Sequence, residues 1–264
     1  MKTVKGHIKR NTMLYKTDVE YGDYTMNHIF GCAHGCKYPC YAFLMKKRFG
    51  LVSSYENWLE PSLVNNTLEL LDKEIPLLKA KINSVQLCFT TDPFMHGYRE
   101  ISQMSLSSIE KLNTAGIRCT ILTKGMLPRE LASYSEENEY GITLISLDEN
   151  YREHTEPGAA SYKERLSALK YLHERGCKTW VSIEPYPTPN LINQDLNNIL
   201  DAVGFTDKII FGRTNYNKEI SSYKNHRSFY NEQAELVVSF CEEWSIDYHI
   251  KEGTMTSKTI SISN

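Results

Sequence analysis

The sequence contains no apolar run long enough to cross a membrane, and its first residues, MKTVKGHIKRNT, lack the apolar segment of a secretory signal. These absences predict a cytoplasmic protein with no membrane partner. The chain also has little excess charge, because 30 Lys and Arg are set against 32 Asp and Glu and are spread along its length. Nucleic-acid binders usually carry a basic face, so the charge does not indicate a nucleic-acid partner, although a local patch can exist within a neutral total.

A disulfide framework is also disfavoured, because the chain has seven cysteines, an odd number, and no export signal. Thiolate chemistry or metal binding is then the better interpretation of any cluster of cysteines. Three of them, Cys32, Cys36 and Cys40, lie within nine residues of sequence. Gly35 and Pro39 allow the intervening loop to curl tightly enough for three thiols to converge on one inorganic centre.

The 264 residues, 41% of them hydrophobic, are enough for one sizeable core, and we expect a single domain over residues 1–264. Short β-rich runs alternate with longer segments of helical apolar spacing, which predicts βαβ units and a parallel sheet. Six such units favour the α/β class with a partial (β/α)6 TIM-type barrel of parallel strands, and a doubly wound open sheet is the alternative. The core should span residues 24–215, followed by a C-terminal helix and strand within 227–252. Strands are expected at Tyr24–Phe30, Val85–Phe89, Cys119–Thr123, Ile142–Ser146, Thr179–Ile183 and Lys208–Gly212, and helices at Leu63–Lys81, Ser102–Ala115, Ser161–Arg175, Asn193–Val203 and Arg227–Glu243.

Polar and conformationally special residues follow each of these apolar runs. Parallel α/β folds place their chemistry at the carboxyl ends of the strands, so we expect these segments to meet at one edge of the sheet. In chain order, they are Gly31–Cys40, Thr90–Pro93, Lys124–Gly125, Asp148, Glu184–Pro185 and Arg213–Asn215.

Three kinds of inorganic centre can use the three clustered cysteines. A structural zinc site needs a fourth protein ligand, for which His34 is available, but the usual second pair of ligands is missing from the sequence. A cluster with four cysteine ligands needs a fourth thiol, and the remaining cysteines lie in apolar surroundings typical of core packing: Cys88, Cys119, Cys177 and Cys241. A cubane with three thiolate ligands and one open iron fits the position of the loop, directly after the first strand.

The cysteine segment resembles the signature of the radical S-adenosylmethionine (SAM) superfamily, and in particular the branch related to spore photoproduct lyase. That branch typically reads Gly-Cys-x-His-x-Cys-x-Tyr-Cys-Tyr-Ala, and this chain inserts Pro39, which changes the spacing to Cys-x3-Cys-x3-Cys. The matching residues are Gly31, Cys32, His34, Cys36, Tyr38, Cys40, Tyr41 and Ala42. Other segments between residues 24 and 200 resemble the same branch in the same order: Thr91-Asp92-Pro93-Phe94, Thr123-Lys124-Gly125, Ser146-Leu147-Asp148, Glu156-Pro157, Arg165-Leu166 and Glu184-Pro185.

The resemblance implies a [4Fe–4S] cluster held by Cys32, Cys36 and Cys40, with SAM chelated to the open iron. It also implies a flavodoxin- or ferredoxin-type reductant, whose electron leads to cleavage of SAM into methionine and a 5′-deoxyadenosyl radical. This radical would abstract hydrogen from a substrate, while the protein positions and shields the cofactors. The sequence assigns neither the substrate nor a catalytic residue.

Candidate contacts to the methionine part of SAM follow from the resemblance and from charge. The segment with Thr91 and Asp92 stands where the branch binds the methionine ammonium, although Asp-Pro is also a common turn. Lys124, Ser146 and Arg165 are candidates for the carboxylate, and Arg is its natural bidentate partner. A solvated helix face is the alternative for Arg165.

The remaining candidates concern the nucleoside part of SAM. Ser146 and Asp148 are candidates for the ribose hydroxyls, and Glu184 for the ribose or the substrate. Tyr41, immediately after the last cysteine, is placed to offer its ring to the adenine.

Two other functions compete with a radical SAM enzyme that acts on an unidentified substrate. The first is repair of a DNA or RNA lesion, or nucleic-acid modification, as in spore photoproduct lyase, which would require a basic groove and a thiol near the substrate. The second is a non-enzymatic zinc-binding module built from the three cysteines and His34.

Overall fold

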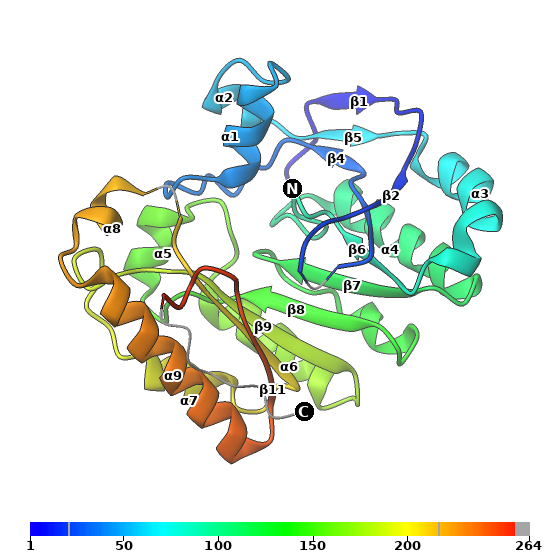
Figure 1. Ribbon diagram of the computed structural model, residues 1–264. Helices are drawn as coiled ribbons and strands as arrows, with labels where there is room; N and C mark the ends of the chain where they lie inside the picture. The colour runs from blue at the N-terminus through cyan, green and yellow to red at the C-terminus, as the bar shows by residue number, and fades with distance from the viewer. Residues whose placement is uncertain (21, 216, 257–264) are drawn as a thin grey trace.

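The computed structural model describes residues 1–20, 22–215 and 217–256, and its main feature is an eight-stranded sheet (Figure 1). Within this sheet, each strand pairs in parallel with its neighbour, except that β2 pairs antiparallel with β3 at one edge. In order across the sheet, the strands are β11 (Asp247–Ile250), β10 (Lys208–Arg213), β9 (Lys178–Tyr186), β8 (Glu139–Thr143), β7 (Arg118–Thr123), β6 (Ser84–Leu87), β3 (Tyr24–Met26) and β2 (Leu14–Lys16).

α-Helices connect most of the successive parallel strands, as in a TIM-type barrel, whereas β7 and β8 are joined through the 3-10 turn Arg129–Ser133. In the described residues the edge strands β2 and β11 do not pair with each other, so the sheet forms the expected partial barrel, with β11 as a further parallel strand. No helix among those residues is both long and apolar enough to span a membrane. The longer helices are α3 (Thr67–Leu78), α4 (Arg99–Thr114), α6 (Tyr162–His173), α7 (Leu196–Val203) and α9 (His226–Trp244), and the shorter ones are α1 (Tyr41–Arg48), α2 (Tyr55–Trp58), α5 (Glu149–Thr155), α8 (Lys218–Ser222) and the 3-10 turns η1 (Lys79–Lys81) and η2 (Arg129–Ser133).

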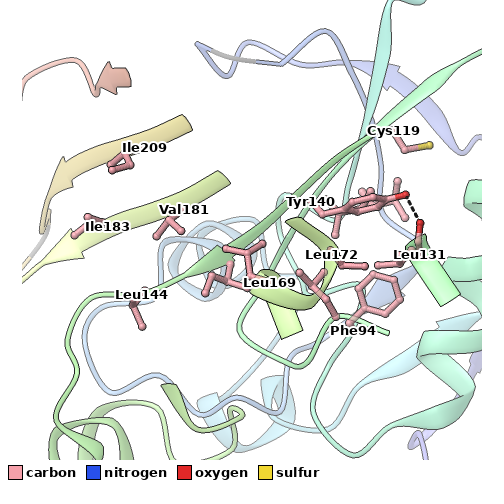
Figure 2. Packing of buried hydrophobic residues seen from close by; sticks show 14 of the residues in the cluster. Phe94, Cys119, Leu131, Tyr140, Leu144, Leu169, Leu172, Val181, Ile183 and Ile209 are labelled. Atoms are coloured by element: carbon pink, nitrogen blue, oxygen red, sulfur yellow. Dashed lines mark hydrogen bonds between the residues drawn. The ribbon is translucent and has the colours of Figure 1, made fainter. Parts of the chain in front are cut away.

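Aliphatic side chains between the sheet and α6 form a large part of the core (Figure 2). Leu169 and Leu172 of α6 and Val181 of β9 are completely buried in one cluster. Burial of each such side chain contributes about 1.5–3 kcal/mol to stability. Tyr140 of β8 extends this core, and its hydroxyl donates a hydrogen bond to the carbonyl oxygen of Leu131 at 3.1 Å. The strands that end at the candidate site therefore rest on a well-packed base.

The N-terminal third differs from the sequence prediction in two places. The expected strand Tyr24–Phe30 is divided into β3 and β4 (Ile29–Phe30), because the intervening Asn27 and His28 are buried polar residues with partners outside the sheet. The expected helix Leu63–Lys81 begins only at Thr67, since Leu63 lies in β5. This strand joins β4 and β1 in a small second sheet, in the order β1 (Gly6–Ile8), β5 (Ser62–Val64), β4.

The four cysteines outside the cluster segment were expected to be core residues. Cys119 and Cys241 are completely buried in the main core, and Cys177 packs against it. Cys88 is also buried, with 4% of its surface exposed, but it lines the pocket described below. Core packing is therefore confirmed for Cys88 too, which belongs to a second buried cluster with Ile29 and Met95, and its place in the pocket wall is an additional finding.

Candidate active site

A pocket of about 430 Å³ lies at the carboxyl ends of β6 to β10. Cys32, Cys36 and Cys40, from the loop between β4 and α1, line one wall of it. A second recess, of about 560 Å³, lies among α6, α7 and α9 on the outside of the barrel and has no cysteine or histidine among its described lining residues. The first pocket is therefore the candidate site, and it lies where the strand-end residues were expected to meet.

The path of the cysteine loop is fixed by close backbone contacts. Gly31 has a φ of +90°, and a Cβ atom there would lie 2.9 Å from the carbonyl oxygen of Trp58. The next residue, Cys32, donates its N–H to that same oxygen at 2.8 Å. Further along, the N–H of Lys37 donates to the carbonyl oxygen of Thr155 at 2.8 Å. The loop is thus attached both to α2 and to the end of α5.

His34 holds the middle of the loop in place. Its carbonyl oxygen accepts a hydrogen bond from the N–H of Gly158 at 2.9 Å, and its Nε2 accepts one from the N–H of His96 at 3.3 Å. Burial lowers the pKa of His34 to about 4, although Asp92 acts in the opposite direction. The imidazole is therefore neutral at pH 7, and the acceptor role of Nε2 assigns the proton to Nδ1. A neutral His34 with both nitrogens occupied serves the structure of the loop.

Asp92 connects three of the strand-end segments. One of its carboxylate oxygens accepts hydrogen bonds from the hydroxyl of Thr123 at 2.6 Å and the N–H of Phe94 at 2.9 Å. The other accepts from the backbone N–H of Lys124 at 2.7 Å and lies 3.5 Å from His34 Nδ1. Both oxygens of this 5% exposed residue thus have protein partners.

Glu156 is the centre of a buried ion network. Lys124 Nζ lies 2.7 Å from one carboxylate oxygen, which also accepts from the Tyr38 hydroxyl, and Arg165 Nη2 lies 2.7 Å from the other. Burial alone would raise the pKa of Glu156, but the two cations lower it to about 2. Arg165 also donates to the carbonyl oxygen of Thr143 at 2.9 Å, so the network joins the cysteine loop to β7, β8 and α6.

The thiols themselves face mostly apolar surroundings. Burial raises the pKa values of Cys36 and Cys40, and raises that of Cys32 most strongly. Lys124 Nζ lies 3.7 Å from the Sγ atom of Cys36 and opposes this effect there. Metal ligation requires thiolates, and binding releases the thiol protons. Burial therefore disfavours the thiolate form of these three sulfurs, and a positive centre bound between them would favour it.

The structure brings together most, but not all, of the predicted site residues. Five predicted SAM contacts line the same pocket as the cysteines: Tyr41, Thr91, Asp92, Lys124 and Glu184. Three others lie outside the described lining of this pocket: Ser146, Asp148 and Arg165.

The three residues outside the pocket each have local structural contacts. Asp148 caps the N-terminus of α5, where its carboxylate accepts from the N–H groups of Asn150 and Tyr151. Ser146 is buried and accepts a hydrogen bond from the N–H of Asp148 at 3.1 Å. Arg165 is completely buried in the ion network of Glu156. Their predicted contacts with SAM stay predictions, and their present partners favour supporting roles.

Three pocket residues have buried polar atoms of a rare kind, and two of them, Gln86 and Arg213, were not among the predicted contacts with SAM. Gln86 Oε1, Thr91 Oγ1 and Arg213 Nε are buried atoms without a hydrogen-bond partner among the described residues. Such atoms are rare in folded proteins and call for an explanation. All three residues line the candidate pocket, so a bound molecule can provide the missing partners. A glutamine inside the apolar run Val85–Phe89 was the sequence signal for Gln86.

Cys88 is the fourth thiol of the pocket. It directly follows β6 and has a φ of +59°, a left-handed conformation that is uncommon for residues other than glycine. Its Sγ atom lies 3.5 Å from His28 Nδ1, and burial raises its pKa to about 12. Strained backbone of this kind often occurs at functional sites.

A second group of ion pairs, more exposed than those of Glu156, lies at pocket residues near the end of β9 and just after β11. Lys251 Nζ, which follows β11, lies 3.6 Å from Glu184 Oε2 and 4.0 Å from Glu20 Oε1. Glu20 also accepts from His249 Nε2 at 2.7 Å and from the N–H of Glu252 at 3.2 Å. Glu20 lies in the loop between β2 and β3, so these contacts connect the two edges of the open sheet.

The fold and this site together define a partial α/β barrel with a strand-end pocket that is lined by three cysteines. A family model described as the radical SAM superfamily matches residues 26–203, which is more than half of the chain. The chain belongs to the radical SAM superfamily. The cofactors of this family are a [4Fe–4S] cluster and SAM.

Similar sequences come from two microbial sources. The chain is 25% identical over 188 residues to the uncharacterized protein ORF301 of Acidianus two-tailed virus, an alignment that covers 68% of this chain and 61% of that protein. It is 28% identical over 189 residues to the uncharacterized protein MJ0683 of Methanocaldococcus jannaschii, with coverage of 70% and 68%. The match thus spans less than two thirds of the viral protein.

Similar solved structures include a spore photoproduct lyase and a protein bound to S-adenosylmethionine. A spore photoproduct lyase complexed with dinucleoside spore photoproduct has a TM-score of 0.67 at 14% identity, with 93% of this chain and 80% of that chain covered. SuiB of Streptococcus suis bound to S-adenosylmethionine has a TM-score of 0.57 at 13% identity, with 86% and 46% covered. At these identities the likeness shows the shared fold.

Proposed function

We propose that this protein is a radical SAM enzyme whose cluster is held by Cys32, Cys36 and Cys40 and whose substrate binds in the same pocket. The observation that carries the proposal is that these three cysteines line one pocket at the strand ends, together with buried polar atoms that lack partners. The proposal includes residues 1–264 as one radical SAM domain and a flavodoxin- or ferredoxin-type reductant as the external partner.

The residues of the pocket fit this pair of cofactors. Three thiolates are suited to iron–sulfur clusters and leave one iron of a cubane without a protein ligand. When bound, the reduced cluster and SAM supply a carbon-centred radical that abstracts hydrogen. A zinc site would instead need its ligands around one ion. No three described His, Cys, Asp or Glu side chains, Cys32, Cys36 and Cys40 included, form a group that could hold a single metal ion.

The roles of the surrounding side chains follow from their contacts. Lys124 places a cation beside Cys36, which favours the thiolate form that a cluster requires. Asp92 and Glu156 fix the position of Lys124 through its backbone N–H and its ammonium. Thr91 and Tyr41 both line the pocket, which supports proposing them as contacts of SAM.

The test is a comparison of Cys36→Ala with Cys177→Ala after anaerobic reconstitution. Cys177 packs against the core and is outside the described pocket lining, so its variant is the matched control. Wild type and Cys177→Ala should be brown, hold about four irons per chain, and form 5′-deoxyadenosine with dithionite and SAM. Cys36→Ala should lose both the cluster and the product. A colourless wild type with one zinc per chain would instead support the zinc-binding module.

A second candidate function is repair of a nucleic-acid lesion, which the pocket position of Cys88 favours. The lyase that this chain resembles requires a thiol hydrogen donor near its substrate, and Cys88 is a protonated thiol in the same pocket as the cluster cysteines. Incubation of the reduced enzyme and SAM with dinucleoside spore photoproduct tests this function. Consumption of the dinucleoside, with altered products in Cys88→Ala, would support repair. Formation of 5′-deoxyadenosine without consumption would direct the search to other substrates.

A further inference from the structure

Arg213 is the last residue of β10 and lies in the wall of the candidate pocket. Its backbone N–H donates to Thr254 Oγ1 at 3.3 Å, and a Cβ atom at Gly253 would lie 3.5 Å from its Nη2 atom. The backbone of Arg213 is therefore held in place, and the residues after β11 pack against its guanidinium.

Arg213 has no ion-pair partner among the residues that the structure describes. None of the ion pairs found within residues 1–20, 22–215 and 217–256 includes Arg213, and its Nε atom is buried without a hydrogen-bond partner there. Other charged residues of the same pocket have partners, since Lys124 pairs with Glu156, and Lys251 lies 3.6 Å from Glu184. A buried donor on a charged group is costly when it remains unpaired.

An oxyanion with two acceptor oxygens would satisfy this guanidinium. Arg binds carboxylate and phosphate groups through two parallel N–H···O bonds, which fits a donor set that the protein leaves open. Gln86 Oε1, on β6 of the same pocket, is a buried acceptor without a partner among the described residues. A ligand with an oxyanion and an N–H or O–H group could satisfy both atoms. The oxyanion would accept from Arg213 Nε, and the N–H or O–H group would donate to Gln86 Oε1.

SAM also carries a carboxylate, but the position of Arg213 argues against that partner. The carboxylate of SAM lies on the same carbon as the ammonium, so it stays next to the cluster that both groups approach. The cysteine loop is attached to segments after β6, β7 and β8 through Asp92, Lys124 and Glu156. Arg213 ends β10, two strands beyond β8. Two strand spacings amount to about 10 Å along the sheet.

We propose that Arg213 anchors an anionic group, carboxylate or phosphate, of the substrate of this enzyme. This assignment rests on the proposed function, because it places the substrate across the pocket from the cysteines. The oxyanion binds at the end of β10, and the rest of the substrate extends toward the cluster side.

Equilibrium dialysis of the reconstituted protein with labelled inorganic phosphate and with labelled acetate tests the anchor. Each probe is measured with and without saturating SAM, on wild type, Arg213→Gln, Arg213→Lys and Arg175→Gln. Arg175 lies after α6, where its guanidinium stacks on Tyr171 away from the pocket, so its variant is the matched control. Tighter binding of phosphate would indicate a phosphate-bearing substrate, and tighter binding of acetate a carboxylate.

The expected result is saturable binding of one anion per chain that persists with SAM. Loss of the guanidinium in Arg213→Gln should weaken the affinity for the anion about tenfold or more. The affinity of Arg175→Gln should equal that of wild type. Arg213→Lys keeps the charge without the bidentate geometry, so its affinity for the anion should lie between those of wild type and Arg213→Gln. The proposal is overturned if neither anion binds, if Arg213→Gln binds as wild type does, or if SAM abolishes binding. Iron content and 5′-deoxyadenosine formation report separately on the proposed function.

Discussion

The two walls of the pocket differ in how their charged groups are paired. On the cysteine side, Asp92 and Glu156 are buried, and each carboxylate oxygen has at least one protein partner within 3.5 Å. On the opposite side, Lys251 lies 3.6 and 4.0 Å from its two carboxylates, and Arg213 has a buried N–H without a partner among the described residues. The carboxylates on the cysteine side are thus satisfied by the protein, whereas Arg213 Nε has no hydrogen-bond partner among the described residues.

This difference fits the two kinds of molecule that a radical SAM enzyme must hold. The cluster and SAM are common to the family, and their chemistry requires fixed positions, which a preorganised network of hydrogen bonds provides. The substrate differs between enzymes, and its groups have to complete contacts that the protein leaves open. We therefore expect substitutions on the cysteine side to affect stability, and those on the opposite side to affect binding.

Loss of the charge on Glu156 should have the largest effect on stability. Glu156→Gln leaves Lys124 and Arg165 as buried cations without a carboxylate, which typically costs 3–5 kcal/mol. Urea unfolding of the metal-free protein measures this change. Glu137→Gln removes a carboxylate that pairs with Lys178 on the surface and should have little effect. Equal effects of the two variants would refute the contrast between buried and exposed pairs.

The titration of Glu156 should make the free energy of unfolding depend on pH. The pKa of Glu156 is about 2 in the folded protein, below its ordinary value of 4.5. Its contribution is therefore complete above about pH 4.5 and is lost as the pH falls through about 2. The gap in unfolding free energy between wild type and Glu156→Gln should shrink by about 3 kcal/mol from pH 5 to pH 2. A gap that stays constant over this range would show that the carboxylate titrates normally.

Asp92 should have an intermediate effect. In Asp92→Asn, an amide N–H₂ group replaces one of two oxygens that accept from the Thr123 hydroxyl, the Lys124 N–H and the Phe94 N–H. An unsatisfied buried donor costs about 1–3 kcal/mol, and the cysteine loop should also retain less iron. Asp195→Asn, at the exposed N-cap of α7, is the control, because Asn caps helices as well as Asp. Unfolding curves and iron content measure both effects, and unchanged iron retention would argue against Asp92 as the support of the loop.

Several features of this molecule could be predicted from the sequence because they depend on local patterns. The parallel strands follow from alternating apolar runs, and the placement of polar segments at one edge follows from the rule for parallel sheets. The short strands β1 and β5 were missed, because three residues carry too little pattern and their pairing partners are far away in sequence.

The sequence could not separate pocket residues from supporting ones. Glu156 lies 32 residues from Lys124 and 118 from Tyr38, so only the folded chain shows that they meet. Arg165 was a plausible anion ligand, but its guanidinium points to Thr143 and Glu156 in the interior. Cys88 has the apolar neighbours of a core residue, and its left-handed backbone at the end of β6 could not be read from them.

The smallest effect is expected at Glu20, on the more open wall. Glu20→Gln weakens the contacts with His249 and Lys251 that join the two edges of the sheet, and surface pairs of this kind contribute about 0.2–1 kcal/mol. The change should appear in amide hydrogen exchange, as faster exchange at Glu252, whose N–H donates to the Glu20 carboxylate. The N–H of Gly158, bound to the cysteine loop, should exchange as in wild type, because the two walls are held by separate contacts. Faster exchange at Gly158 as well would mean that the walls are coupled, and the comparison between them would fail.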